Sequence, residues 1–408
     1  MAFSQVTATV TGLGATTPLG GTAAATWEAM LAGVSGASAL TDEWALDLPS
    51  RLAAKVKVEP GEVLDRVRAR KLDRCQQLAL IAAREAWADA GAPEVAPERL
   101  AVVIGTGIGG MQTLLQQDDL LEATGSSRKI SPHTVPMMMA NGSAGQVSIE
   151  LGARGGAFTP VSACASGAEA LAMALDLIRL GRADVVIAGG TEALVHRTPL
   201  AAFAQAKTLS TRNEDPTRAS RPFDAGRDGL VLGEGAALLV LESPEFAAAR
   251  GARPLAGLAG SGITSDAYHI TAGSREGQVR AIRMALESAS VTPQQIDLVH
   301  AHATSTELGD LTEAESITEA IGTHPAVTAT KSMTGHLLGG SGALGALATV
   351  LALRDGIAPA TLNLEEQDPR IKLDVVTGAP RAGAYRTALA NSFGFGGHNV
   401  SLVFTAVD

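Results

Sequence analysis

Val161-Ser162-Ala163-Cys164-Ala165-Ser166-Gly167-Ala168 joins an extended segment to an Ala-rich segment that we expect to be helical as far as Leu180, with Gly181 as its stop. Cys164 therefore lies at the predicted start of a helix, where the helix dipole and the unpaired N–H groups favour a thiolate over a thiol. Its small neighbours let an acyl group approach the sulfur. A buried and unreactive cysteine is the alternative, because free cysteine is among the most buried residue types. The octet alone leaves both interpretations open.

The composition is that of an ordered globular chain. Its 408 residues are too many for one ordinary core and predict two domains or one duplicated unit. Hydrophobic residues make up 46% and charged residues 18%, which argues against a disordered chain, and the net charge of −10 argues against general binding to nucleic acid. Two cysteines cannot staple a chain of this length, which indicates a reducing compartment. Without a recognisable signal peptide, and with the apolar segment Leu337–Leu353 too short and Gly-rich to span a membrane, we expect a cytoplasmic protein that is not bound to a membrane.

Predicted strands and helices alternate along the first half of the chain. Val6–Val10 is a predicted strand that enters the glycine-rich turn Gly12–Gly21, whose glycine spacing does not match the dinucleotide-binding fingerprint. Asp65–Gly91 is predicted as one helix, and Cys75 lies on its apolar face, where it is most simply a packing residue. Asp184–Gly190 is a mostly apolar strand, which is typical of a sheet covered on both faces.

The second half repeats the first in outline. Leu255–Thr264 resembles Thr9–Thr17, since each is a short extended run that leads into glycines. Val327–Thr330 is a predicted strand that leads through a turn into a Gly/Ala-rich helix, in the place that the Cys164 segment occupies in the first half. We therefore predict an α/β fold of two similar halves that face each other across one central site, with these boundaries: residues 1–250 and residues 251–408.

Polar residues in Gly-, Ser- and Thr-rich turns are the further candidates for chemistry. His302 and His336 each follow a predicted strand in such a turn, which is a poor place for a merely packed histidine. His300 and His302 would point to the same side of a strand, but without a Cys-x-x-Cys pair or a His/Asp cluster beside them we predict no metal site. Lys331 is either a solvated surface residue or the single charge of the turn before His336. Two aromatic residues flanked by glycines are either core residues or a mobile lid: Phe393 and Phe395.

Four motifs carry a resemblance to a known family: Val161–Gly167 (VSACASG), His302–Thr306 (HATST), Lys331–His336 (KSMTGH) and Asn391–Gly397 (NSFGFGG). They resemble, in order, the signatures of the type II β-ketoacyl-acyl-carrier-protein synthases of fatty-acid synthesis, to which the polyketide ketosynthases are related. The resemblance implies the duplicated thiolase-like fold with five layers, α-β-α-β-α, and a homodimer. It also implies condensation of an acyl-carrier thioester with malonyl-carrier, with release of carbon dioxide. The implied partner is acyl carrier protein, which supplies phosphopantetheine, and no tightly bound cofactor is implied.

The same resemblance assigns roles to single residues. It makes Cys164 the nucleophile, His302 and His336 the pair that promotes decarboxylation and stabilises the enolate, and Lys331 the residue that tunes the electrostatics. The backbone N–H groups of Cys164 and Phe395 form the implied oxyanion hole, and acyl transfer does need donors where negative charge develops. The resemblance also implies that Phe393 and Phe395 form a gate and that Thr304 and Thr306 contact pantetheine. The implied acyl pocket is formed by Ile108, Phe203 and Leu338, and the implied acidic partner of Lys331 is Glu313.

A run of cations is predicted to dock the carrier protein. Carrier proteins are typically acidic and this chain is acidic too, so docking needs a local basic patch. Five cations crowd one stretch of nine residues: Arg66, Arg68, Arg70, Lys71 and Arg74. Further candidates are Arg128, Lys129, Lys207 and Arg212, of which Lys207 matches a carrier-contacting arginine of relatives. A solvated helix face is the alternative interpretation of the cluster.

Three positions depart from the family pattern, and three neighbouring protein classes are the alternatives to it. Ala303 stands where many relatives have Gly, and His398 where Thr is common. His300 replaces the usual Asn or Glu, which puts in doubt the structural cation of some members. Chain-length factors typically lack the cysteine, thiolases use a second cysteine near the C-terminus, and type III synthases use a Cys-His-Asn set. The residues present therefore favour a condensing enzyme with a Cys-His-His set.

Overall fold

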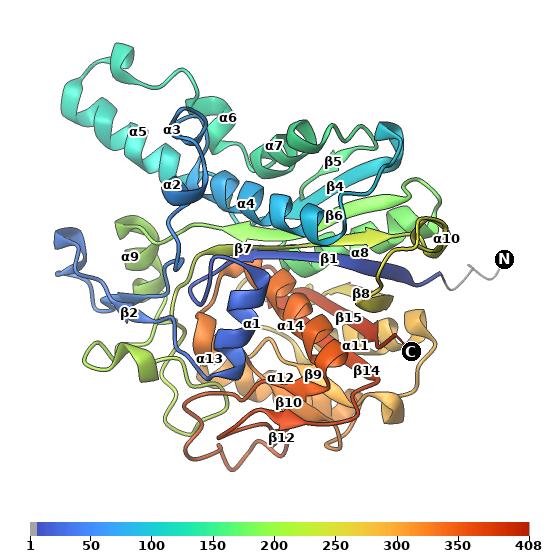
Figure 1. Cartoon of the computed structure of the whole chain (residues 1–408). Coiled ribbons are helices and arrows are strands. Elements are labelled where there is room, and N and C mark those ends of the chain that lie inside the picture. The colour runs from blue at the N-terminus through green and yellow to red at the C-terminus, as the bar shows by residue number, and fades with distance from the viewer. Residues whose placement is uncertain (1–5, 408) are drawn as a thin grey trace.

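A mixed sheet of 11 strands organises the structure, a computed structural model that describes residues 6–407 (Figure 1). The first half of the chain contributes five of these strands: β1 (Ala8–Thr16), β4 (Leu100–Gly105), β5 (Ala157–Phe158), β6 (Val185–Glu192) and β7 (Gly235–Glu242). The second half contributes six: β8 (Ala256–Ser265), β9 (Leu298–His300), β10 (Ala326–Thr328), β12 (Asp374–Val375), β14 (Thr387–Gly394) and β15 (His398–Thr405). Two small sheets pair β2 (Ser38–Ala39) with β3 (Leu52–Ala53) and β11 (Ile357–Ala358) with β13 (Arg381–Ala382).

Both halves of the sheet have the same strand order. The first half runs β5-β4-β6-β7-β1 and the second runs β10-β9-β14-β15-β8, so each lies in the order third, second, fourth, fifth, first, with β12 added beyond β10. The halves meet where Ala8–Val10 of β1 pairs antiparallel with Ala256–Leu258 of β8. The repeated order confirms the predicted α/β duplication, while the boundary between residues 250 and 251 stays a prediction.

Helices form three layers around the strands. The outer layers are α4 (Arg74–Asp89) with α7 (Gly142–Leu151) on the first half and α11 (Arg275–Ala289) with α12 (Glu307–Ala320) on the second. Between the two sets of strands lie α8 (Ser166–Arg179) and α14 (Ser341–Asp355), which contact each other and strands of both halves. The predicted α-β-α-β-α layering is therefore confirmed. The remaining helices are α1 (Ala23–Leu31), α2 (Pro60–Val63), α3 (Arg66–Ala69), α5 (Met111–Thr124), α6 (Thr134–Met138), α9 (Arg197–Gln205), α10 (Pro244–Ala249) and α13 (Lys331–Thr334).

The two central helices cross where glycines bring their first turns together. A Cβ atom on Gly167 of α8 would lie 2.7 Å from the carbonyl oxygen of Gly339 and 2.9 Å from the amide nitrogen of Ala343. A Cβ atom on Gly342 of α14 would in turn lie 2.7 Å from the amide nitrogen of Ala168. Side chains at these glycines would push the helices apart, so the glycines hold the turn before α8 against the turn before α14.

The glycines near the N-terminus belong to a strand, which corrects the predicted turn at Gly12–Gly21. Strand β1 continues to Thr16, and a Cβ atom on Gly12 or Gly14 would overlap backbone atoms of α4. In β8, Gly260 and Gly262 meet α11 in the same way. The glycines thus permit a close strand–helix contact once in each half, which gives a physical basis to the resemblance between the two segments.

The predicted helix Asp65–Gly91 is also two helices in the structure. Helix α3 ends at Ala69 and α4 begins at Arg74, where Asp73 caps α4 by accepting a hydrogen bond from the N–H of Cys75 at 2.9 Å. Cys75 is buried as predicted. Within residues 6–407 no helix has the length and apolar character needed to cross a membrane.

Candidate active site

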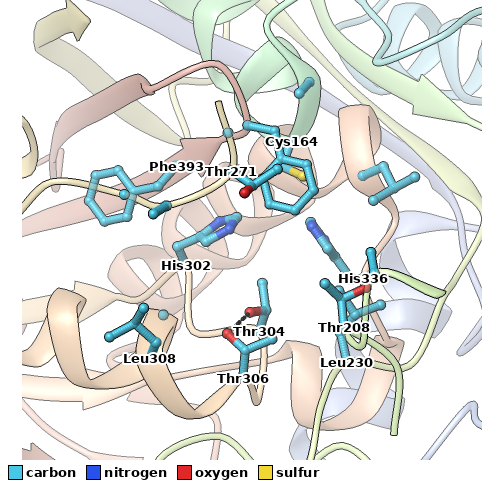
Figure 2. A pocket seen from close by; sticks show the side chains of 18 of the residues that line it. Cys164, Thr208, Leu230, Thr271, His302, Thr304, Thr306, Leu308, His336 and Phe393 are labelled. Atoms are coloured by element: carbon cyan, nitrogen blue, oxygen red, sulfur yellow. Dashed lines mark hydrogen bonds between the residues drawn. The ribbon is translucent and has the colours of Figure 1, made fainter. Parts of the chain in front are cut away.

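The nucleophile candidate lies on a tight turn at the start of α8. Residues Ala163–Ala165 form one turn of 3-10 helix, and Ala163 has a positive φ of 51°. The Ser166 hydroxyl accepts from the N–H of Ser162 at 2.9 Å and donates to the carbonyl of Ala163 at 2.7 Å. This strained turn presents Cys164 to a cavity, and Figure 2 shows its sulfur on the same side as two histidine rings.

The two histidines meet across that cavity from separate loops. His302 follows β9 and His336 follows α13, yet their ring centroids are 5.4 Å apart and their planes are nearly perpendicular at 85°. The His302 ring also lies 5.8 Å from the ring of Phe393. The structure therefore brings together Cys164, His302 and His336, as the sequence predicted (Figure 2).

Both imidazoles are held in the neutral form. Burial lowers the pKa of His302 and of His336 well below the usual value, and the positive charge of Lys331 lowers both pKa values further. Nδ1 of His336 is 2.9 Å from the hydroxyl of Ser341. When that hydroxyl donates to Nδ1, the ring proton sits on Nε2. Neutral rings of this kind act as hydrogen-bond donors and not as acids.

Lys331 and Glu313 hold the His302 loop from two sides. The buried ammonium of Lys331 donates to the carbonyl of His302 at 2.5 Å, while the carboxylate of Glu313 accepts from the N–H groups of His302 at 2.8 Å and Ala303 at 2.6 Å. Among the ion pairs of residues 6–407, none joins Lys331 to Glu313; both side chains bond the same loop, and their opposite charges interact. Burial lowers the pKa of Lys331 to about 8, and the charge of Glu313 opposes that shift.

Cys164 is a thiol in the resting site, which differs from the expectation for a helix start. Burial raises its pKa to about 12 and outweighs the opposing effects of the Lys331 charge and of the backbone N–H groups of Phe395 and Cys164. Those two N–H groups nevertheless point at the sulfur. They are the pair that the family resemblance assigned to the oxyanion hole.

The cavity has a volume of about 530 Å³ and one apolar side. The predicted residues that line it, besides the Cys-His-His set, are Ile108, Phe203, Lys207, Thr304, Thr306, Leu338, Phe393 and Phe395. The hydroxyls of Thr304 and Thr306 lie 3.0 Å apart and face the cavity together. On the other side, Cys164 packs on an apolar cluster that includes Leu200, Leu209 and Leu230.

Several lining residues carried no signal in the sequence. Thr208, Leu230 and Thr271 lie outside the helices and strands, and Leu308 lies in the first turn of α12; none of the four belongs to a recognisable motif (Figure 2). Gly394 is different, because a Cβ atom there would overlap the carbonyl oxygen of Ser162. Gly394 of the NSFGFGG motif therefore lets the end of β14 touch the cysteine turn, and that role can be inferred only once the two segments are known to meet.

His300 belongs to the core and not to the cavity. It is buried, its Nε2 is 2.9 Å from the Thr330 hydroxyl, and a Cβ atom on Gly345 would lie 2.9 Å from its ring. Burial and the Lys331 charge lower the pKa of His300 to about 3. A neutral ring thus fills the space beside Gly345. In the described part of the chain no three His, Cys, Asp or Glu side chains are grouped as a metal site requires.

The predicted docking cations differ in their exposure and in their ion pairs. Arg66, Arg70 and Lys71 are exposed, but Arg68 pairs with Glu150 at 2.7 Å. The predicted cluster also included Arg74, whose guanidinium is 2.6 Å from the buried carboxylate of Glu234 and 2.8 Å from that of Glu59. None of the five lines the cavity, whereas Lys207 lies at its edge.

Comparison with known proteins identifies this arrangement. The family model described as "Beta-ketoacyl synthase, N-terminal domain" matches residues 7–247, and "Beta-ketoacyl synthase, C-terminal domain" matches residues 255–365. The chain is 47% identical to the 3-oxoacyl-acyl-carrier-protein synthase 2 of Mycobacterium tuberculosis, over 97% of this chain and 96% of that protein. It is 45% identical to the synthase of the same name from Synechocystis, over 97% of both chains.

Solved structures agree with this result. A β-ketoacyl synthase from Burkholderia phymatum has a TM-score of 0.92 and 35% identity, covering 99% of this chain and 100% of that one. A type II polyketide ketosynthase in complex with its acyl-carrier protein has a TM-score of 0.91 and 31% identity, with the same coverage. On its fold, its motifs and these full-length similarities, the chain belongs to the β-ketoacyl synthase family.

Proposed function

We propose that this protein lengthens an acyl chain by two carbons through decarboxylative Claisen condensation with malonyl-acyl-carrier protein. The observation that carries the proposal is the meeting of Cys164, His302 and His336 around one cavity that has an apolar side for an acyl chain. The relatives at 41–47% identity are named 3-oxoacyl-acyl-carrier-protein synthase 2, which supports this reaction, and a fatty-acid pathway is part of the proposal.

In the first half-reaction the acyl group moves from the carrier to Cys164. The sulfur attacks the thioester carbonyl, the carrier thiol leaves, and the proton of Cys164 ends on that thiol. Negative charge develops on the carbonyl oxygen, where the N–H groups of Phe395 and Cys164 stabilise it. The proton has to leave Cys164 as the bond forms, because its thiol pKa of about 12 keeps the thiolate scarce in the free site.

In the second half-reaction malonyl-carrier loses carbon dioxide. The resulting enolate oxygen accepts hydrogen bonds from Nε2–H of His302 and His336, and the α-carbon attacks the acyl carbonyl on Cys164. The new carbon–carbon bond replaces the bond to sulfur, and the released thiolate takes up one proton. Neutral histidines suit this step because they stabilise the oxyanion without protonating the carbon that must attack.

Acyl carrier protein is the proposed partner, with its phosphopantetheine arm as the only prosthetic group needed. The paired hydroxyls of Thr304 and Thr306 suit the amide groups of that arm. The exposed cations of the Arg66–Lys71 stretch, with Lys207 at the edge of the cavity, suit the acidic carrier surface.

A homodimer in the cytoplasm is the proposed form of the protein. Strand β5 is one end of the 11-stranded sheet, α7 packs beside it, and large apolar side chains are exposed on α7 and on the adjoining α6. They include Val135, Met138 and Ile149, of which Ile149 is 74% exposed. An exposed apolar surface beside a free strand edge suits a second copy of this chain. Sedimentation velocity tests this, and a monomer at micromolar concentration would contradict it.

Intact-mass measurement tests the reaction itself. The protein is incubated with acyl-carrier proteins of graded chain length, and the acylated peptide is then identified. We expect the acyl group on Cys164 and β-ketoacyl-carrier product once malonyl-carrier is added. Cys164→Ala should lose both results and keep the melting temperature. Acylation of Cys75 in its place, or no product with any donor, would overturn the proposed function.

A further inference from the structure

A buried carboxylate that the proposed reaction does not use lies beneath the cavity. Glu192 is the last residue of β6 and is fully buried. It accepts three hydrogen bonds, from the Thr106 hydroxyl at 2.9 Å, from the N–H of Gly107 at 2.6 Å and from the N–H of Gly339 at 3.1 Å. Among the ion pairs of residues 6–407 none involves Glu192, so its environment consists of neutral donors.

The three donors come from both halves of the fold. Thr106 and Gly107 follow β4 in the first half, whereas Gly339 belongs to the turn after His336 in the second half. A Cβ atom on Gly107 would lie 2.7 Å from Oε2 of Glu192, and a Cβ atom on Gly339 would lie 2.8 Å from it. Each loop therefore needs a glycine at the point where the carboxylate approaches it, because a Cβ atom would overlap the carboxylate.

Each of these loops carries one wall of the acyl pocket. Ile108 follows Gly107, Leu338 precedes Gly339, and both line the cavity that contains Cys164. Leu338 also has a positive φ of 44°, a conformation that surrounding contacts must maintain. A buried carboxylate is stable only when its oxygens are well bonded, so loss of Glu192 would leave the two N–H groups unpaired and release both loops.

We propose that Glu192 is a positioning residue that joins the two walls of the acyl pocket and so sets which acyl donors fit. The proposal rests on the proposed function, since the occupant of the pocket is the acyl chain on Cys164. It assigns to Glu192 no contact with substrate. Its effect passes through the Gly107–Ile108 and Leu338–Gly339 segments, which it bonds directly.

The experiment compares condensation with acetyl-carrier and dodecanoyl-carrier donors in four proteins: wild type, Glu192→Ala, Glu192→Gln and the control Glu85→Ala. Glu85 also accepts two backbone N–H groups, from Ala15 and Ala23 at 2.8 Å each, but lies away from the cavity. We expect Glu192→Ala to lower kcat/KM for the long donor about tenfold more than for acetyl. Glu192→Gln keeps one acceptor oxygen, so its ratio of kcat/KM for the two donors should return most of the way to the wild-type ratio. Glu85→Ala should lower the melting temperature and leave the ratio of the two donors unchanged.

A second variant covers the case in which Glu192→Ala does not fold. Thr106→Val removes only the hydroxyl donor and should shift the donor ratio in the same direction by a smaller factor. Equal losses for both donors in Glu192→Ala, or a wild-type donor ratio in Thr106→Val where Glu192→Ala does not fold, would overturn the inference. Failure of wild type to condense any donor would instead overturn the proposed function, so the two failures are distinct.

Discussion

Replacing Gly167 by alanine tests the crossing of the two central helices. The new Cβ atom would lie 2.7 Å from the carbonyl oxygen of Gly339, about 0.7 Å short of the 3.4 Å at which ordinary van der Waals contact begins. Both obstacles, that oxygen and the amide nitrogen of Ala343, are backbone atoms that cannot rotate away. The turn that carries Cys164 must therefore move relative to the turn that carries His336 by several tenths of an ångström.

We expect Gly167→Ala to lower the stability of the protein slightly and the rate of condensation strongly. Overpacking of this kind costs roughly 1–3 kcal/mol, which corresponds to a decrease in Tm of about 1–4 °C for a chain of this length. A misplacement approaching 1 Å between reacting groups can lower the rate about 100-fold. We therefore expect Gly167→Ala to reduce kcat/KM for condensation by about 10- to 100-fold in a protein that still melts cooperatively.

The assay measures kcat/KM for condensation with purified acyl- and malonyl-carrier proteins, and differential scanning calorimetry measures Tm. Gly61→Ala is the matched control, because a Cβ atom on Gly61 meets no atom within 4 Å and should change neither quantity. Full activity in Gly167→Ala at an unchanged Tm would refute the reasoning, since the backbone atoms would then have yielded without moving the site. A large loss in Gly61→Ala would show that the assay responds to any glycine substitution.

The remaining predictions concern the histidines, the carrier and pH. His302→Ala and His336→Ala should each lower malonyl decarboxylation about 100-fold or more while Cys164 still accepts an acyl group, as mass spectrometry checks; normal decarboxylation by either variant would contradict its role. Arg70→Glu with Lys71→Glu should raise KM for acyl-carrier substrates and weaken its dependence on salt, whereas a small acyl-pantetheine mimic should react as before; an equal loss with the mimic would rule out docking. The rate of condensation should fall as pH rises through about 8, because Lys331 then loses the charge that lowers the pKa of the Cys164 thiol. A Lys331→Met variant should lack this decline. If the variant showed the same decline, the titrating group would be a residue other than Lys331.

The broad architecture could be predicted because it depends on patterns that are local in the sequence. Apolar strands, glycine-rich turns and the repeat of Thr9–Thr17 in Leu255–Thr264 are each recognisable within a dozen residues. The meeting of Cys164, His302 and His336 followed from placing the two halves face to face. Each of these inferences needed only the order of elements along the chain.

Other features depend on contacts between distant segments, which no local pattern contains. The glycines of β1 look like a turn until α4 is placed against them. The pKa of Cys164 depends on burial by loops from the whole chain, which here outweighs the helix start. Glu192 ends an apolar strand like many exposed acids, and its three donors lie 85 or more positions away along the chain.

The pairing of β1 with β8 removes any hinge between the halves. Backbone hydrogen bonds at Ala8–Val10 make the two sets of strands one sheet, and α8 and α14 are packed between them with their first turns in contact. A rigid-body opening would break this pairing and expose the central core, so substrates cannot be admitted by separating the halves. Access to the cysteine must come through the cavity itself, whose lining reaches the surface at Lys207 and Leu308. Thermal unfolding should accordingly be one cooperative event for the whole chain.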